Sequence, residues 1–182
     1  KFEHLYDYDA VKKALDKLVL LEDFKTLITG RGKVARGDKE IIDHLGINQV
    51  SPEELLMRDQ EGPSYAMLDL EDYNKHREGR DFDRSEFYQN PERYEGDFDR
   101  FTQVIDLFVA GHFYGNGAPI ILTREAMADP ACRIKVVADV SCDIDGPVAC
   151  TIRPSTIADP FYGYDPQTHT EVDFMEPNAI GV

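Results

Sequence analysis

The 182-residue sequence has few basic residues, no long apolar run and no cysteine pairs. Lysine and arginine together number 20, against 35 aspartates and glutamates, so the formal net charge is −15. Because nucleic-acid binders carry basic surfaces that neutralise phosphates, this balance argues against a nucleic-acid partner. No apolar run approaches the length of a membrane span and no signal peptide is visible, so no membrane partner is predicted.

The cysteines exclude two further kinds of site. Cys132, Cys142 and Cys150 are odd in number and form no C-x-x-C pair. Neither a disulfide framework nor a zinc site is therefore predicted. Free thiols fit a reducing cytoplasm, where we expect the protein to reside, and we expect all three to be buried.

What the sequence does have is a short apolar run followed by a glycine turn and a helical pattern, at residues 24–46. Residues 25–29 are expected to form a strand. Gly30 and Gly32 then give G-x-G, with Ala35 at the third fingerprint position. In this fingerprint the first glycine makes a tight turn, and the second lets the backbone approach a pyrophosphate at a helix N-terminus. The order of strand, turn and helix predicts a dinucleotide site.

The rest of the chain alternates strand and helix patterns. Further strands are expected at 47–50, 106–110 and 134–140, and helices after Asp9, Ser51 and Thr123, while Gly46 is placed to end the fingerprint helix. The run at 134–140, IKVVADV, is typical of a strand buried on both faces. This alternation predicts an α/β fold, Rossmann-like, with a mostly parallel sheet and helices on both faces.

Two segments stand apart from the βαβ pattern. Residues 1–22 are expected to form a lead-in helix, which leaves 23–182 as the nucleotide-binding domain. Residues 69–100, here named the charged insertion, are dense in Asp, Glu and Arg with interleaved Tyr and Phe. This patterning predicts a solvated insertion with short helices. Because the chain starts without methionine, we expect a piece of a longer protein.

Ligands of open α/β sheets bind outside the carboxyl ends of the strands. The loops 30–35, 111–116 and 141–145 are therefore expected to converge. His112 is a candidate acid or base, although a structural hydrogen bond is the alternative reading. Tyr114 could pack on a cofactor ring or close the edge of the sheet.

The choice between NAD and NADP stays open at this level. An acidic residue about 20 positions after the glycines would bind the ribose 2′-hydroxyl of NAD. Ser51 stands there instead, in a capping-box pattern with Glu54, and could still contact the ribose. Arg31, Lys33 and Arg58 could offset the 2′-phosphate of NADP.

Other kinds of site fit less well. Asp139, Asp143 and Asp145 suggest a metal cluster, but no matching His or Glu accompanies them, so Asp143 is better explained as a ribose or supporting contact. A P-loop would need a hydroxyl residue where Val34 stands, and a methyltransferase turn would need a glycine there. No metal site is predicted.

Five motifs together carry a family resemblance, namely TGRGKVARG, VSPEELL, NPERYEGDF, PIILTREAM and VVADVSCDIDGPVACTIRPSTIADPFYGYDP. From about Leu27 to its end, the sequence resembles lysine–2-oxoglutarate reductase. That saccharopine-forming enzyme is related to saccharopine dehydrogenase and, more distantly, to alanine dehydrogenase and transhydrogenase. The resemblance implies a Rossmann-like cofactor domain inserted into a catalytic domain, and hydride transfer between NAD(P)H and the condensation product of lysine with 2-oxoglutarate.

The resemblance also implies a site. Together with Ser51 from the spacing argument, the expected cofactor-binding residues are Gly30, Arg31, Gly32, Lys33, Val34, His112, Tyr114, Val140, Ser141 and Asp143. The family's acid/base lysine and histidine lie in the catalytic domain, which nothing here matches, so no catalytic residue is expected in this chain. The lead-in helix at 1–22 would then come from that preceding domain.

The expected cofactor is NADP or NAD. The expected substrates of the full-length protein are lysine, 2-oxoglutarate or saccharopine, and a homo-oligomer is compatible with the sequence. An alanine- or opine-type dehydrogenase domain is one alternative. A degenerate Rossmann domain with a regulatory role and no catalysis is the other.

Overall fold

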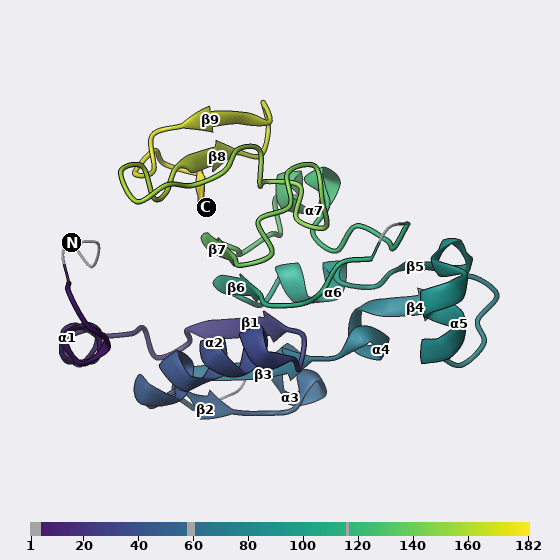
Figure 1. Ribbon diagram of the computed structural model, residues 1–182, viewed down its shortest axis with the longest axis horizontal. Coiled ribbons are helices and arrows are strands. Elements are labelled where there is room, and N and C mark those ends of the chain that lie inside the picture. The colour runs from purple at the N-terminus through teal and green to yellow at the C-terminus, as the bar shows by residue number, and fades with distance from the viewer. Residues whose placement is uncertain (1–4, 58–60, 116) are drawn as a thin grey trace.

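The computed structural model describes residues 5–57, 61–115 and 117–182, and an eight-stranded sheet forms its centre (Figure 1). The strands are β1 (Lys25–Thr29), β2 (Asn48–Gln49), β3 (Ser64–Leu68), β6 (Leu107–Ala110), β7 (Val136–Asp139), β8 (Gly163–Asp165), β9 (Thr170–Val172) and β10 (Ile180–Gly181). Their order is β2–β3–β1–β6–β7–β10–β8–β9. Pairing is parallel from β2 to β10 and antiparallel on both sides of β8. The predicted mostly parallel sheet is confirmed.

Helices cover both faces of this sheet. The helices in the described part of the chain are α1 (Tyr8–Leu15), α2 (Lys33–His44), α3 (Pro52–Leu56), α4 (Leu70–Tyr73), α5 (Arg84–Gln89), α6 (Asp99–Thr102) and α7 (Arg124–Ala128), of which α2, α3, α6 and α7 cover the sheet. On one face, Ile42 of α2 packs in a core with Ile28 of β1. On the other, α3, α6 and α7 bury Leu55, Phe101 and Met127 in the larger core. Because neighbouring residues of a strand point to opposite faces, β1 contributes to both cores.

The strand order differs from the one that the sequence suggested, in which the second strand, at 47–50, would lie next to the first. The chain leaves α2 at Gly46, whose φ of +71° ends the helix as predicted. It then forms β2 at the edge of the sheet, and only the next strand, β3, pairs with β1. On the β2 side, the neighbour of β1 is therefore 64–68, which was not predicted, whereas β6 on its other side was.

Strand β7 is less buried than its sequence suggested. Val137 packs in the larger core, but Val136 is exposed and Ala138 shares its outward direction. The core around α2 includes Ile28 and Val109 and no residue of β7. The expectation that β7 is buried on both faces was wrong. The apolar composition of a strand does not show whether a helix such as α2 extends far enough to cover it.

The two ends of the chain also differ from expectation. Asp7, and not Asp9, caps α1 by accepting a hydrogen bond from the Ala10 amide at 2.7 Å. The helix ends at Leu15, so Val19 is exposed instead of extending its apolar face. At the other end, β8, β9 and β10 form a sheet extension that was not predicted.

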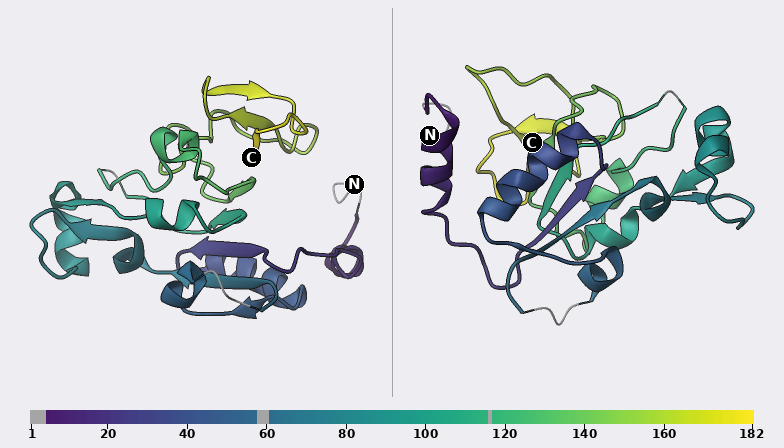
Figure 2. Two further views of the ribbon diagram at one scale, coloured as in Figure 1. Left: turned by 180° about the vertical axis from the view of Figure 1, so that it is seen from behind. Right: turned by 60° about the horizontal axis from the view of Figure 1, so that its bottom comes forward.

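The charged insertion is a small folded unit beside the sheet. Its strands β4 (Asn74–His76) and β5 (Tyr94–Gly96) pair antiparallel, and a 3₁₀ turn at Pro91–Arg93 follows α5. Figures 1 and 2 show β4, β5 and α5 projecting beyond the carboxyl ends of β1 and β3. The predicted short helices are present, and a two-stranded antiparallel sheet accompanies them.

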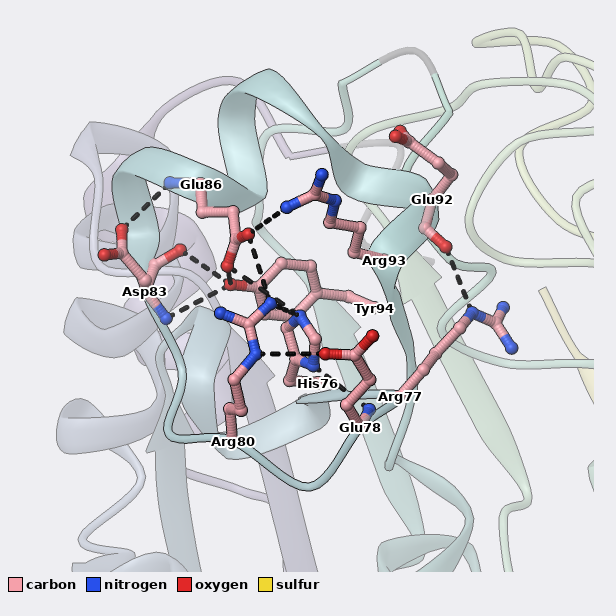
Figure 3. Close-up of polar contacts among 9 residues, drawn as sticks. All are labelled: His76, Arg77, Glu78, Arg80, Asp83, Glu86, Glu92, Arg93 and Tyr94. Carbon is pink, nitrogen blue, oxygen red and sulfur yellow. Dashed lines mark hydrogen bonds and ion pairs between the residues drawn. The ribbon is translucent and has the colours of Figure 1, made fainter.

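Aromatic packing and a carboxylate hold the charged insertion together (Figure 3). Tyr94 and Phe87 are buried, with ring centroids 5.2 Å apart. Glu86 of α5 accepts hydrogen bonds from Arg93 at 2.6 Å and from the Tyr94 hydroxyl at 3.1 Å. His76 is buried beneath the Tyr94 ring. The insertion therefore has a core of its own, which a fully solvated segment would lack.

The three cysteines are free. Cys150 is buried and Cys132 half-buried, but Cys142 is exposed, so the expected burial was wrong for that thiol. Among the residues described, no helix has the length and apolar character needed to traverse a bilayer.

Candidate functional site

A cleft lies at the carboxyl ends of β1, β3 and β6. Three segments line it, namely 30–34 from the glycine turn, five residues of the charged insertion (Asp69, Leu70, Tyr73, Arg84 and Tyr88), and 111–113 after β6. The structure thus brings together Gly30, Arg31, Gly32, Lys33, Val34 and His112, six of the predicted site residues.

Two glycines leave part of one wall of the cleft, here named the glycine wall, as bare backbone. At Gly30, φ is +95° and a Cβ atom would lie 2.8 Å from the Gly111 carbonyl oxygen, so only glycine allows the two loops to approach. At Gly32 a Cβ would meet no heavy atom within 4 Å. Gly32 is also the N-cap of α2 and has no side chain to satisfy the first helical amides. Open backbone ahead of uncapped amides suits a phosphate group.

His112 contributes a buried hydrogen-bonding atom to the cleft. Its Nδ1 lies 2.6 Å from Thr29 Oγ1, whereas its buried Nε2 has no partner among the described residues. Burial lowers the pKa of His112 to about 4, against the opposing charges of Asp139 and Asp143. The ring is therefore neutral at neutral pH and offers a hydrogen bond instead of a charge. A buried polar atom without a partner is costly, so this nitrogen suits a ligand atom.

The opposite wall carries charged side chains of the insertion. Asp69 follows β3 and caps α4, accepting from the Leu70 amide at 2.8 Å. Nη2 of Arg84 lies 2.8 Å from Asp69 Oδ1 and 2.9 Å from Glu71 Oε2. From the glycine turn, Arg31 Nε lies 3.8 Å from Asp69 Oδ2. The Asp69 carboxylate thus connects the insertion to the glycine wall.

None of the insertion's cleft residues was predicted. The available signal was an aspartate directly after a strand, but the strand 64–68 itself was missed. The density of charge around Asp69 and Arg84 then made both look like ordinary solvated residues.

An apolar pocket adjoins the cleft on the side of the insertion. It shares Leu70, Tyr73, Tyr88, His112 and Phe113 with the cleft and adds Phe87, Tyr114 and Ile121 among its lining. The predicted site residue Tyr114 therefore lies next to the cleft, with its hydroxyl donating to the Ala118 carbonyl at 2.8 Å. The cavity volume of this pocket is about 50 Å³, which is smaller than a site for a ligand ring requires, so the aromatic walls close the edge of the cleft.

Ser51 lies elsewhere. Its hydroxyl accepts from the Glu54 amide at 3.1 Å, and its own amide donates to Glu54 Oε2 at 2.8 Å, which confirms the predicted capping box. Because β2 is the edge strand, Ser51 follows a strand that does not touch β1. It lines a second groove with Arg31, Arg36 and Lys39, here named the basic groove, which shares Arg31 with the cleft.

Val140, Ser141 and Asp143 follow β7 and are not among the residues that line the cleft. Asp139 orders this loop, accepting from the Ser141 amide at 3.0 Å and from Thr151 Oγ1 at 2.5 Å. Of the three loops expected to converge, 30–35 and 111–116 meet in the cleft. The loop 141–145 lies next to the end of β6, where the Ser141 amide donates to the Ala110 carbonyl at 3.2 Å, but it does not line the cleft. Arg58, a candidate for a 2′-phosphate contact, lies outside the described residues.

Comparison with known proteins points to one enzyme. No family model matches the chain. Over 174 residues it is 24% identical to alpha-aminoadipic semialdehyde synthase of Arabidopsis thaliana, covering 85% of this chain and 16% of that protein. Over 176 residues it is 27% identical to the mitochondrial alpha-aminoadipic semialdehyde synthase of Bos taurus, covering 85% of this chain and 19% of the relative. The chain resembles the alpha-aminoadipic semialdehyde synthases.

This likeness confirms the predicted resemblance to the saccharopine-related oxidoreductases. The chain spans less than a fifth of the length of either alpha-aminoadipic semialdehyde synthase. It is thus similar to one segment of a much larger enzyme. The mitochondrial location is that of the bovine protein. The cytoplasmic location of this chain stays a prediction.

Proposed function

We propose that the chain is the NAD(P)-binding domain of an oxidoreductase that forms or cleaves saccharopine. The cleft carries this proposal, because a glycine turn, an uncapped helix N-terminus and the buried Nε2 of His112 meet there. These are the groups that a pyrophosphate and its riboses require at the carboxyl ends of parallel strands. Similarity to the alpha-aminoadipic semialdehyde synthases supports the substrate class.

Each part of the cleft has a role in this proposal. When bound, a nicotinamide dinucleotide supplies the hydride donor or acceptor. The backbone of Gly32 and the first amides of α2 hold its pyrophosphate, with Arg31 and Lys33 adding positive charge, while Gly30 makes the tight turn before them. His112 hydrogen-bonds the cofactor through Nε2. Val140, Ser141 and Asp143 remain candidates for the nicotinamide end, and Ser51 for the ribose.

The acid/base groups of the reaction would come from another domain, to which the segment 1–22 would lead. In that arrangement this chain orients the cofactor, while the full-length protein binds lysine, 2-oxoglutarate or saccharopine. The isolated chain should then bind a dinucleotide and turn nothing over.

Calorimetric titration with NADH, NADPH and ADP-ribose tests the cleft. Gly32→Asp should fold, because aspartate is a favoured N-cap and φ at this position is −75°. Its carboxylate would occupy the helix amides and repel a pyrophosphate, so dinucleotide affinity should fall at least tenfold. Gly37→Asp is the matched control, since it adds the same charge to the same helix outside the cleft. A wild-type chain that is folded and binds none of the three compounds would contradict the proposal and favour the degenerate Rossmann module.

Assays of the full-length protein test the substrate class. Oxidation of NADH or NADPH should require lysine together with 2-oxoglutarate. Turnover with alanine and no response to lysine would favour the alanine- or opine-type alternative.

A further inference from the structure

Thr29 and His112 form a buried polar pair at the carboxyl ends of two neighbouring strands. Thr29 is the last residue of β1 and lies opposite Ala110, the last residue of β6. Nδ1 of His112 lies 2.6 Å from Thr29 Oγ1, and both side chains are buried. A Cβ atom at Gly30 would lie 2.9 Å from the His112 Cα atom. The pair is therefore located where the glycine turn and the loop after β6 meet.

The number of hydrogen bonds that the pair can make indicates which nitrogen of His112 carries the proton. A neutral imidazole has one N–H donor and one accepting nitrogen, and a hydroxyl has one proton to donate. If Nδ1 donated to Thr29, both the hydroxyl proton and Nε2 would lack a partner among the residues described. If Thr29 donates to Nδ1, only the N–H at Nε2 is left over. Because unpaired buried polar groups are costly, the second arrangement is favoured.

The acidic side chains that act on His112 do not take this N–H. The charges of Asp139 and Asp143 both act on the ring. The Asp139 carboxylate is already used, because it accepts from the Ser141 amide at 3.0 Å and from Thr151 Oγ1 at 2.5 Å. Neither carboxylate is hydrogen-bonded to Nε2. Since His112 lines the cleft, its second nitrogen is available to a ligand atom.

We propose that Thr29 is a positioning residue, which keeps the proton of His112 on Nε2 so that this nitrogen donates to an acceptor oxygen of the ligand. This inference rests on the proposed function and defines what His112 recognises in the cleft. A neutral N–H donor suits a phosphate or carbonyl oxygen and offers no lone pair to a group that approaches as a donor. A nicotinamide dinucleotide carries such oxygens in its pyrophosphate and in its carboxamide.

Nitrogen-15 NMR of the imidazole rings tests the assignment without any ligand, with the His112 signals identified from their loss in His112→Asn. In the wild-type chain at neutral pH the proton should be on Nε2. Thr29→Val removes the hydroxyl with little change of shape, and its His112 signals should show both tautomers. Thr29→Ser should restore the wild-type signals. Thr26→Val is the matched control, because Thr26 is buried in the same strand and its Oγ1 has no partner among the described residues.

Calorimetric titration with NADH and with ADP-ribose tests the consequence for binding. Thr29→Val should weaken NADH binding by about two- to tenfold, the range of one hydrogen bond between neutral groups. His112→Asn is too short to place a donor where Nε2 lies, so adding Thr29→Val to it should cause no further loss. Thr26→Val should bind as the wild type does. An equal loss for ADP-ribose assigns the acceptor to the pyrophosphate half, and a loss for NADH alone assigns it to the carboxamide.

The result that contradicts the inference differs from the one that contradicts the proposed function. A proton on Nδ1 in wild-type His112, or tautomers unchanged in Thr29→Val, would overturn the inference even if NADH binds. Additive losses in Thr29→Val and His112→Asn would also overturn it, because Thr29 would then act independently of His112. A wild type that carries the proton on Nε2 and binds neither compound would overturn the proposed function and the ligand contact with it, but not the assignment of the proton.

Discussion

The two walls of the cleft, the glycine wall and the wall formed by the charged insertion, present different chemical groups. On the glycine wall, Gly32 and the first amides of α2 face the open space, while Gly30 lies against the loop after β6. On the insertion wall, the side chains of Asp69, Arg84 and Tyr88 do so. Backbone amides recognise a phosphate, which every dinucleotide carries, whereas side chains of defined charge can distinguish one dinucleotide from another. Under the proposed function, the glycine wall would contact the phosphates and the insertion wall would contact other parts of the ligand.

The walls also differ in what supports them. The glycine wall continues from β1, whose five residues are all buried in the main sheet. The insertion wall depends on a small aromatic cluster and on ion pairs such as Arg77–Glu95, which is solvent-exposed. Exposed ion pairs contribute little to stability. The aromatic cluster should therefore carry most of the support for the insertion wall.

Removing the core of the insertion should have the largest effect. Phe87→Ala deletes a buried ring and should cost about 3–5 kcal/mol of local stability. Amide hydrogen exchange should lose protection in β4 and β5 while β1 and β6 keep theirs. Tyr88→Ala, at an adjacent and exposed position, should leave exchange nearly unchanged. Equal loss of protection in β1 would mean that both walls belong to one cooperative unit.

Adding one methyl group to the glycine wall should have the next largest effect. Gly30→Ala combines a positive φ with contacts of 2.8 and 2.9 Å to Gly111 and His112, and should destabilise the protein by about 2–4 kcal/mol. Gly32→Ala meets no atom within 4 Å and should keep wild-type stability. Chemical denaturation of the two variants measures the difference. Similar values for both would show that the two loops do not approach as closely as described.

Acidification should weaken the contact between the walls through His112. Its pKa is lowered from 6.5 in the unfolded chain to about 4 in the fold, so between these values the unfolded state binds more protons. Stability therefore rises with pH across this window and is lost as pH falls, by about 2 kcal/mol between pH 7 and pH 5. Denaturation of wild type and His112→Asn at both pH values measures this term as a difference. The same pH dependence in both proteins would argue against a buried neutral His112.

Elements whose signals are local were predicted well. The strand 25–29, the turn after it and the helix ended by Gly46 agree with β1 and α2. The capping box at Ser51 and the helix cap at Thr123 are confirmed. In each case the residues that decide the conformation lie within a few positions of one another, so the sequence displays them together.

Elements that depend on distant partners were missed or misjudged. Strand β3 is placed between β1 and β2, and β10 joins β7 from the far end of the chain. The exposure of Val136 depends on where α2 ends its coverage of the sheet. The charge density of the insertion concealed Tyr94 and Phe87, whose burial comes from packing between α5 and a two-stranded sheet.

The glycine turn and the helix after it could be predicted from the sequence, because turn geometry and helix capping depend on short-range sterics and hydrogen bonds. The motifs that carry the family resemblance could likewise be identified without the fold. The placement of Asp69 beside Gly30, and of Ser51 after the edge strand β2, could be seen only in the folded structure. Strand order in a parallel sheet is settled by packing between residues far apart in the chain. The position of Asp69 in the cleft could therefore be identified only after β3 had taken its place next to β1.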